Sequence, residues 1–171
     1  KTIEKAGLEA DDLLGTLAKR CEEMGMEVSV ISGDRDLLQL ATEHVKIRIP
    51  KTKQGKTEIE DYYAADVKAR YQVTPEEFID LKALMGDTSD NIPGVPSIGE
   101  KTATKIITEY GSIENAYAHV TELKPPRASK ALSEHYDLAQ MSKVLATIHV
   151  NADFEYEIAD AKLGDLYTEE A

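Results

Sequence analysis

The stretch that decides the fold is GDTSDNIPGVPSIGEKTA, residues 86–103. Asp87 and Asp90 bring two carboxylates within one turn's reach of each other, and hard divalent cations prefer such oxygen ligands. Gly94, Pro96 and Gly99 then predict a tight turn before an amphipathic helix, whose first amides attract anions. A metal site beside an anion-binding turn would hold a phosphate ester at one end and cut it at the other. Taken alone, the stretch fits an Asx-rich loop followed by a helix equally well.

The composition predicts a folded chain rather than a disordered one, because 42% of the 171 residues are hydrophobic and 30% are charged. The net charge of −12 argues against a generic nucleic-acid binder, although residues 101–150, which follow the turn, carry a slight excess of basic residues. The single cysteine, Cys21, cannot form an internal disulfide, and no apolar run approaches membrane-spanning length. We therefore expect a cytoplasmic protein with no membrane partner.

The first part of the chain predicts an α/β fold. Apolar residues at helical spacing predict a helix over residues 13–21, and residues 27–32 predict a short buried strand. The next apolar residues, 37–41, are expected to be helical. Alternation over residues 45–49 predicts a second strand, and residues 57–60 predict an edge strand that returns after a turn.

Helical periodicity begins at residue 61, which divides the chain into an α/β part, residues 1–60, and a helical part, residues 61–171. Helices are expected at several places in the second part, over residues 61–71, 75–85, 101–110, 112–120 and, as one longer helix, 127–146. Residues 154–158 alternate in polarity and are expected to be extended.

Acidic residues gather at three boundaries between predicted elements, namely Glu9, Asp11 and Asp12, then Asp34 and Asp36, then Asp87 and Asp90. In the first cluster Glu9 and Asp12 share a helix face, but acids there also pair favourably with the helix dipole. In the second cluster the aspartates directly follow a strand, where open α/β sheets bind their ligands. Asp36 could equally be the N-cap of the following helix, which would leave Asp34 unexplained.

An all-carboxylate cluster favours Mg²⁺ or Mn²⁺ over zinc, because the chain has no group of histidines or cysteines beside these acids. Two such ions about 4 Å apart would activate a water molecule and stabilise the leaving oxygen of a phosphodiester. Carboxylates crowded together would also repel one another strongly without cations. We therefore expect the three clusters to converge in one pocket at the carboxyl ends of the sheet strands.

Three motifs in order carry a resemblance that extends over nearly the whole chain: LEADD at residues 8–12, SGDRDLLQL at 32–40, and residues 86–103. Together they resemble the 5′ nuclease domain of bacterial DNA polymerases I, which belongs to the flap-endonuclease family. The resemblance implies a partial PIN-like α/β domain of the 5′ nuclease type, followed by a helical region of the helix-three-turn-helix type. The helix-hairpin-helix within that region corresponds to residues 92–110.

The resemblance implies a two-metal 5′-3′ exonuclease and flap endonuclease of replication and repair. Its metal-binding and catalytic positions correspond to all of the acidic residues named above. The hairpin of the family binds the duplex backbone, often with a K⁺ ion, and its positions correspond to Gly94, Ser97, Gly99, Lys101, Thr102 and Lys105. The implied partners are DNA with 5′ ends or flaps, RNA–DNA primer junctions and a polymerase domain in the same chain, at the nucleoid.

Two departures from the family pattern matter. Ser97 stands where glycine is usual, and a positive φ at this position would strain the serine. The family's opening third, with its first strand and its helical arch, does not precede Lys1 in this sequence. We therefore expect the chain to be part of a longer protein and to show little or no cleavage alone.

Alternatives from other classes stay open. A free-standing 5′ nuclease without a polymerase would carry the same residues. A non-catalytic module that binds DNA by its structure could use the hairpin alone, although it would have no need for the acidic clusters. A protein-interaction domain with an acidic surface would leave residues 94–101 unexplained.

Overall fold

Residues 2–53 and 55–164 are described by the computed structural model. The first part of the chain contains a helix, a sheet and a 3₁₀ turn: α1 (Ala10–Glu23), β1 (Val28–Ile31), η1 (Arg35–Leu40), β2 (Val45–Lys53) and β3 (Lys56–Tyr62). The second part is helical and comprises α2 (Ala64–Tyr71), α3 (Pro75–Met85), α4 (Glu100–Tyr110), α5 (Ile113–Ala118), η2 (Val120–Glu122), α6 (Pro126–Glu134), α7 (Tyr136–Ala146) and η3 (Ile158–Ala161).

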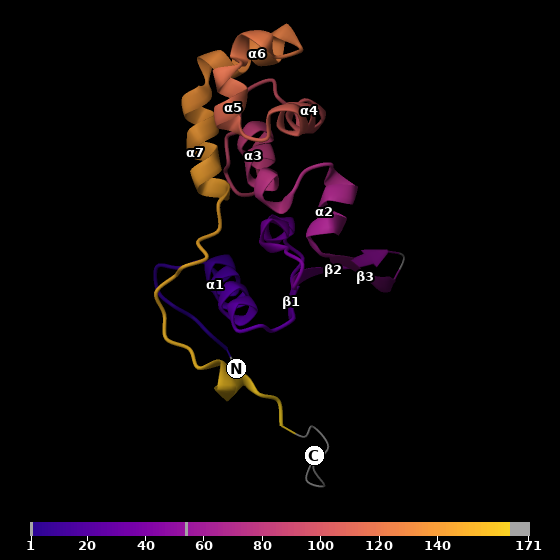
Figure 1. Cartoon of the computed structure of the whole chain (residues 1–171), viewed down its shortest axis with the longest axis vertical. Coiled ribbons are helices and arrows are strands. Elements are labelled where there is room, and N and C mark those ends of the chain that lie inside the picture. The colour runs from indigo at the N-terminus through magenta and orange to yellow at the C-terminus, as the bar shows by residue number, and fades with distance from the viewer. Residues whose placement is uncertain (1, 54, 165–171) are drawn as a thin grey trace.

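The two parts lie one beyond the other along the long axis of the molecule. In Figure 1 helices α3 to α7 are at the top, the sheet and α1 lie below them, and α2 lies between. The predicted order, an α/β part followed by a helical part, is confirmed. Within the described ranges, no helix is both long enough and apolar enough to cross a membrane.

β2 is the central strand of the sheet, paired in parallel with β1 and antiparallel with β3. Its alternate residues Val45, Ile47 and Ile49 are buried, as the period-2 pattern predicted. The predicted helix over 61–71 begins later, at Ala64, because β3 continues as far as Tyr62, which is buried and pairs with Ile47.

The segment after β1 is a 3₁₀ helix rather than a turn of α-helix. Its N-cap is Asp34, whose side chain accepts a hydrogen bond of 2.8 Å from the backbone N–H of Asp36. The capping role that the sequence suggested for Asp36 is therefore wrong. The side chain of Asp36 does not cap η1. Leu37 and Leu38 are fully buried and anchor η1 against the core.

The long helix expected over residues 127–146 is also wrong, because the chain forms α6 and α7 with a break at His135. His135 has φ −129° and ψ 32°, outside the helical region. Neither proline nor glycine marks this break. Because of this break, α6 and α7 run in different directions. Leu132 of α6 and Ala139 of α7 are nevertheless both buried in the core.

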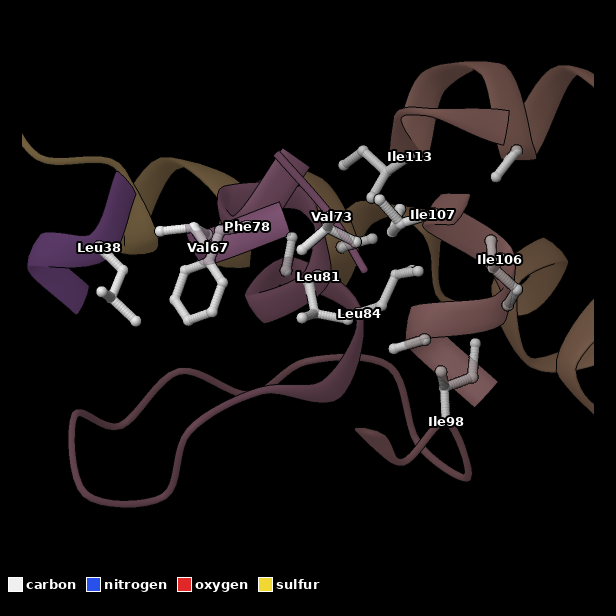
Figure 2. Packing of buried hydrophobic residues seen from close by; sticks show 14 of the residues in the cluster. Leu38, Val67, Val73, Phe78, Leu81, Leu84, Ile98, Ile106, Ile107 and Ile113 are labelled. Atoms are coloured by element: carbon white, nitrogen blue, oxygen red, sulfur yellow. The ribbon is translucent and has the colours of Figure 1, made fainter. Parts of the chain in front are cut away.

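α3 lies at the centre of the helical part and connects it with the α/β part. Thr74 caps its N-terminus by accepting the backbone N–H of Glu77, and Pro75 occupies the first turn. One core cluster runs through both parts, and Figure 2 shows Leu38 and Phe78 at one side of it and Ile107 at the other. Both parts therefore share one hydrophobic core, which fixes η1 relative to the end of α3.

The chain after α7 returns along α1, as Figure 1 shows. Phe154 and Ala152 are buried against Leu13, and Arg20 donates hydrogen bonds of 3.1 Å to the carbonyls of both Ala152 and Phe154. The predicted extended segment is confirmed up to η3, which turns at Ile158–Ala161. The end of the predicted helical part, beyond residue 164, lies outside the described residues.

Candidate metal centre and adjoining hairpin

The loop after α3 is closed at its base. Asp87 and Ile92 exchange two backbone hydrogen bonds, of 2.9 Å and 2.8 Å, and Asp87 Oδ1 accepts the backbone N–H of Ser89 at 2.8 Å. This small closed loop is what holds Asp87 and Asp90 close to each other. Asp36 reaches them from η1, so that carboxylate oxygens of Asp36, Asp87 and Asp90 all lie within 4.8 Å of one another.

The remaining acidic residues surround this trio. One depression, of about 450 Å³, is lined by Asp34 and by all three members of the trio. A second, of about 300 Å³, is lined by the whole first cluster together with acids of the other two: Glu9, Asp11, Asp12, Asp34, Asp36 and Asp90. The structure thus brings all three predicted clusters to one region, beside the carboxyl end of β1. Which of these residues act as ligands stays a prediction.

Lys82 lies inside the acidic region, a residue that the sequence analysis missed. Its Nζ contacts Asp36 Oδ1 and lies 2.7 Å from Asp87 Oδ2 and 3.7 Å from Asp90 Oδ2. Burial disfavours the charged form of Lys82, but the close carboxylates of Asp36 and Asp87 outweigh it and raise the pKa of Lys82. A protonated ammonium therefore sits among the carboxylates.

The carboxylates of the site titrate differently. Burial raises the pKa of Asp11, and the charges of Asp34 and Glu9 add to the effect. Burial likewise raises the pKa of Asp36, although Lys82 opposes the shift. Hydrogen bonds from Lys82 and Ser89 hold the pKa of Asp87 well below its usual range, so this carboxylate is ionised at neutral pH.

The donor set fits a hard divalent cation. All candidate ligand atoms of the trio are carboxylate oxygens, the type that Mg²⁺ and Mn²⁺ prefer. Asp36 Oδ1 is buried, and among the described residues no donor meets it with hydrogen-bond geometry, although Lys82 touches it. By contrast, Asp12 accepts backbone N–H groups of Glu9 and His149 with its two oxygens, at 3.2 Å and 2.9 Å, which gives it a structural role.

The predicted tight turn, residues 94–99, is the hairpin of the expected helix-hairpin-helix and lies directly behind the acidic loop. Gly94 has φ +61°, and a Cβ atom there would press on Gly86 N and lie 2.7 Å from the carbonyl carbon of Met85. Its N–H donates to Ser142 Oγ of α7 at 2.9 Å, in a fully buried contact. Gly94 therefore supports the hairpin from inside. Because its backbone touches Gly86, it also ties the hairpin to the acidic loop.

The exposed side of the hairpin carries the other DNA-binding candidates. Ser97 has φ +70°, the strained conformation that its departure from glycine suggested, and its Oγ accepts a 3.1 Å hydrogen bond from Arg127 Nη2. Gly99 is the N-cap of α4. Thr102 is half-buried in the first turns of α4, whereas Lys101 and Lys105 are exposed there.

Sequence reasoning also missed Ser142 and Arg127, which hold the hairpin from α7 and α6. Neither carries a local signal, because both act across long stretches of chain. Lys82 carries a weak one. It stands among the buried residues Leu81, Ala83 and Leu84, a place where a lysine needs a partner.

Two family models cover almost the whole chain. The model described as "5′-3′ exonuclease, N-terminal resolvase-like domain" matches residues 1–72, and the one described as "5′-3′ exonuclease, C-terminal SAM fold" matches residues 73–169. The DNA polymerase I of Bacillus caldotenax is 50% identical over 157 residues, and that of Bacillus subtilis 48% identical over 151 residues. These matches cover 92% and 88% of this chain but only 18% and 17% of the two polymerases.

Solved structures show the same fold. The T5 5′-exonuclease, determined with bound zinc, superposes with a TM-score of 0.74 at 28% identity, over 88% of this chain and 53% of that one. The T5 flap endonuclease in a complex with DNA and metal ions gives the same TM-score and identity. The catalytic core of Rad2, at 16% identity and a TM-score of 0.55, is similar in fold alone. From these matches together, the chain belongs to the 5′-3′ exonuclease family.

Proposed function

We propose that the protein carrying this chain is a divalent-metal-dependent 5′ nuclease, which hydrolyses phosphodiester bonds at 5′ ends and flaps of DNA. The observation that carries the proposal is the meeting of Asp36, Asp87 and Asp90 within 4.8 Å, directly beside the hairpin. The metal ions and DNA in the T5 structures support it, as does the polymerase I identity of the relatives.

We further propose two Mg²⁺ or Mn²⁺ ions in this site, although the T5 structure holds zinc. The reason is the ligand set, which offers carboxylate oxygens and no sulfur or imidazole. When bound, such ions activate a water molecule and stabilise the leaving oxygen of the cut bond. Asp36, Asp87 and Asp90 would hold the ions. Lys82, charged and buried beside them, offsets part of the repulsion among the carboxylates.

The hairpin and the start of α4 are proposed to bind the duplex backbone. The amides that begin α4 and the ammonium groups of Lys101 and Lys105 present hydrogen-bond donors and positive charge to a phosphate. The same proposal has four further parts: a K⁺ ion at the hairpin, RNA–DNA primer junctions as substrates, a polymerase domain in the same polypeptide, and a cytoplasmic location.

The test is cleavage of a 5′-flap DNA by the whole natural protein and by its Asp34→Asn variant, with Mg²⁺. Asparagine keeps the oxygen that caps η1 but removes the charge that a metal ligand needs, so folding and DNA binding should persist. Cleavage should fall by orders of magnitude. The matched control is Asp153→Asn, an exposed aspartate far along the chain, which should cut normally. Robust cutting by Asp34→Asn would remove that residue from the site, and no cutting by the natural protein would refute the function.

A further inference from the structure

A cleft of about 600 Å³ lies between the end of α2 and the outer side of α4. Its lining includes Arg70 and Gln72 from α2 and its C-cap, and Lys101, Thr104 and Lys105 from α4. The proposed function accounts for the two lysines as part of the hairpin region. It gives no role to the α2 wall, which belongs to a different segment of the chain.

The cleft adjoins the acidic site. Tyr71, Leu81 and Glu100 line both the cleft and the depression that contains Asp36, Asp87 and Asp90. Tyr71 is fixed between the two, because its ring packs edge-on against Phe78 with centroids 5.4 Å apart. The cleft and the depression of the acidic site therefore share one wall, which Tyr71, Leu81 and Glu100 form.

The charge of the cleft differs from that of the whole chain, whose net charge is −12. Arg70, Lys101 and Lys105 bring three positive groups, against the carboxylates of Glu100 and Glu109. In residues 2–53 and 55–164, none of the three basic side chains forms an ion pair, and all three are exposed. The guanidinium of Arg70 lies over the Tyr71 ring, 5.5 Å from its centroid, which directs it towards the wall shared with the acidic site.

We infer that this cleft receives the sugar–phosphate backbone of the nucleic-acid strand next to the cleaved bond, and that Arg70 is a phosphate-positioning residue in it. The inference rests on the proposed function, since it takes the acidic site as the place of cleavage. A guanidinium presents a planar fork of donors that matches phosphate oxygens, and three unpaired cations along a groove match a repeating chain of phosphates. The hydroxyl of Thr104 already donates to the Glu100 carbonyl at 2.8 Å, so it can only accept from a ligand, and the basic groups must supply the binding.

The experiment compares Arg70→Glu with Lys68→Glu in the whole natural protein. Lys68 is exposed on the same helix but lines a different depression, so it is a matched charge reversal outside the cleft. Binding of a fluorescent 5′-flap DNA is measured in EDTA over a series of salt concentrations, and kcat and KM are measured with Mg²⁺. Arg70→Glu should weaken binding about tenfold and flatten the slope of log affinity against log salt by roughly one, with Lys68→Glu near the natural protein.

Two further readouts separate positioning from a structural effect. Arg70→Lys keeps the charge and should restore most of the affinity, and KM should rise in Arg70→Glu while kcat stays within about twofold. Arg70→Gln removes the positive charge without adding a negative one, so it should lower the affinity by less than Arg70→Glu does. If the natural protein cuts the flap and Arg70→Glu binds it as Lys68→Glu does, this inference is wrong while the proposed function stands. If the natural protein neither binds nor cuts the flap, the proposed function itself fails.

Discussion

The ammonium nitrogen of Lys82 lies 2.7 Å from Oδ2 of Asp87, on a lysine side chain that is only 7% exposed. Asp36 and Asp90 contact the same nitrogen, so one buried lysine serves three carboxylates from two segments of the chain. If a metal ion binds these carboxylates, as proposed, it and Lys82 would compete for the same oxygens or share them. The lysine would then be a built-in cation that supports the site when metal is scarce.

Replacing this lysine should make the fold depend on metal. Lys82→Met keeps most of the side chain but removes its charged end, which leaves the carboxylates without their partner. The expected loss is on the order of 3 kcal/mol of unfolding free energy in EDTA. Millimolar Mn²⁺ should recover more stability in Lys82→Met than in the natural protein, because binding to the native state stabilises it. Thermal melts in EDTA and in MnCl₂ measure both effects, with Lys68→Met as the control. An equal rise in Tm for the natural and variant proteins would show that the metal does not replace the lysine.

Ser97 should be a site of backbone strain. A left-handed conformation is costly for every residue except glycine, and Ser97 has φ +70°. Ser97→Gly and Ser97→Ala both remove the hydrogen bond from Arg127, but only glycine relieves the strain. We expect Ser97→Gly to be more stable than Ser97→Ala by about 1 kcal/mol. Urea denaturation of the pair decides this, and equal midpoints would mean that the backbone at this position is relaxed.

Gly94 should tolerate no side chain. A Cβ atom there would meet the backbone of Gly86 and Met85, and alanine would also be held at φ +61°. Gly94→Ala should lose at least about 3 kcal/mol of unfolding free energy. Gly33→Ala is the control, because a Cβ there meets nothing within 4 Å, and it should change stability by less than about 0.5 kcal/mol. Similar melting curves for the two variants would contradict the close contact.

Lys101 should contribute to DNA binding through charge and not through base sequence. Lys101→Glu should weaken binding of unrelated duplexes about equally and reduce the salt slope by roughly one. Lys68→Glu, the same charge reversal at an exposed position of α2, tests whether any such change in net charge has the same effect. A change of sequence preference in Lys101→Glu, with the salt slope intact, would rule out backbone binding by this residue.

The elements that follow from local chemistry were predictable from the sequence. Alternation in β2, the proline and threonine that begin α3, and the glycine at the end of α4 each determine structure within a few residues. The convergence of the acids was predicted from their positions at strand ends and helix starts. The shared core that brings η1 to the end of α3 could not be read from the sequence. The sequence could not show that Asp34 rather than Asp36 caps η1. Both residues fit an N-cap pattern, and only the backbone geometry distinguishes them.

The remaining features depend on contacts between distant segments. Lys82 carries only a weak local signal, because its partner Asp36 comes from η1, a distant segment of the chain. The break at His135 has no glycine or proline to announce it, because packing of α6 and α7 onto different neighbours decides it. Arg127 and Ser142 meet the hairpin only from α6 and α7, after the chain has passed through α4 and α5. The periodicity of the sequence does not predict contacts between such distant residues.

The contact between Gly86 and Gly94 has a consequence for the proposed cleavage. With no side chain between them, the loop of Asp87 and Asp90 and the hairpin cannot slide apart, so the interval from one to the other is set by main chain alone. If the hairpin grips a duplex phosphate and the acids cut, the protein works as a ruler. The number of nucleotides between the start of the duplex and the cut bond would then be constant, and it would be the same for every base sequence.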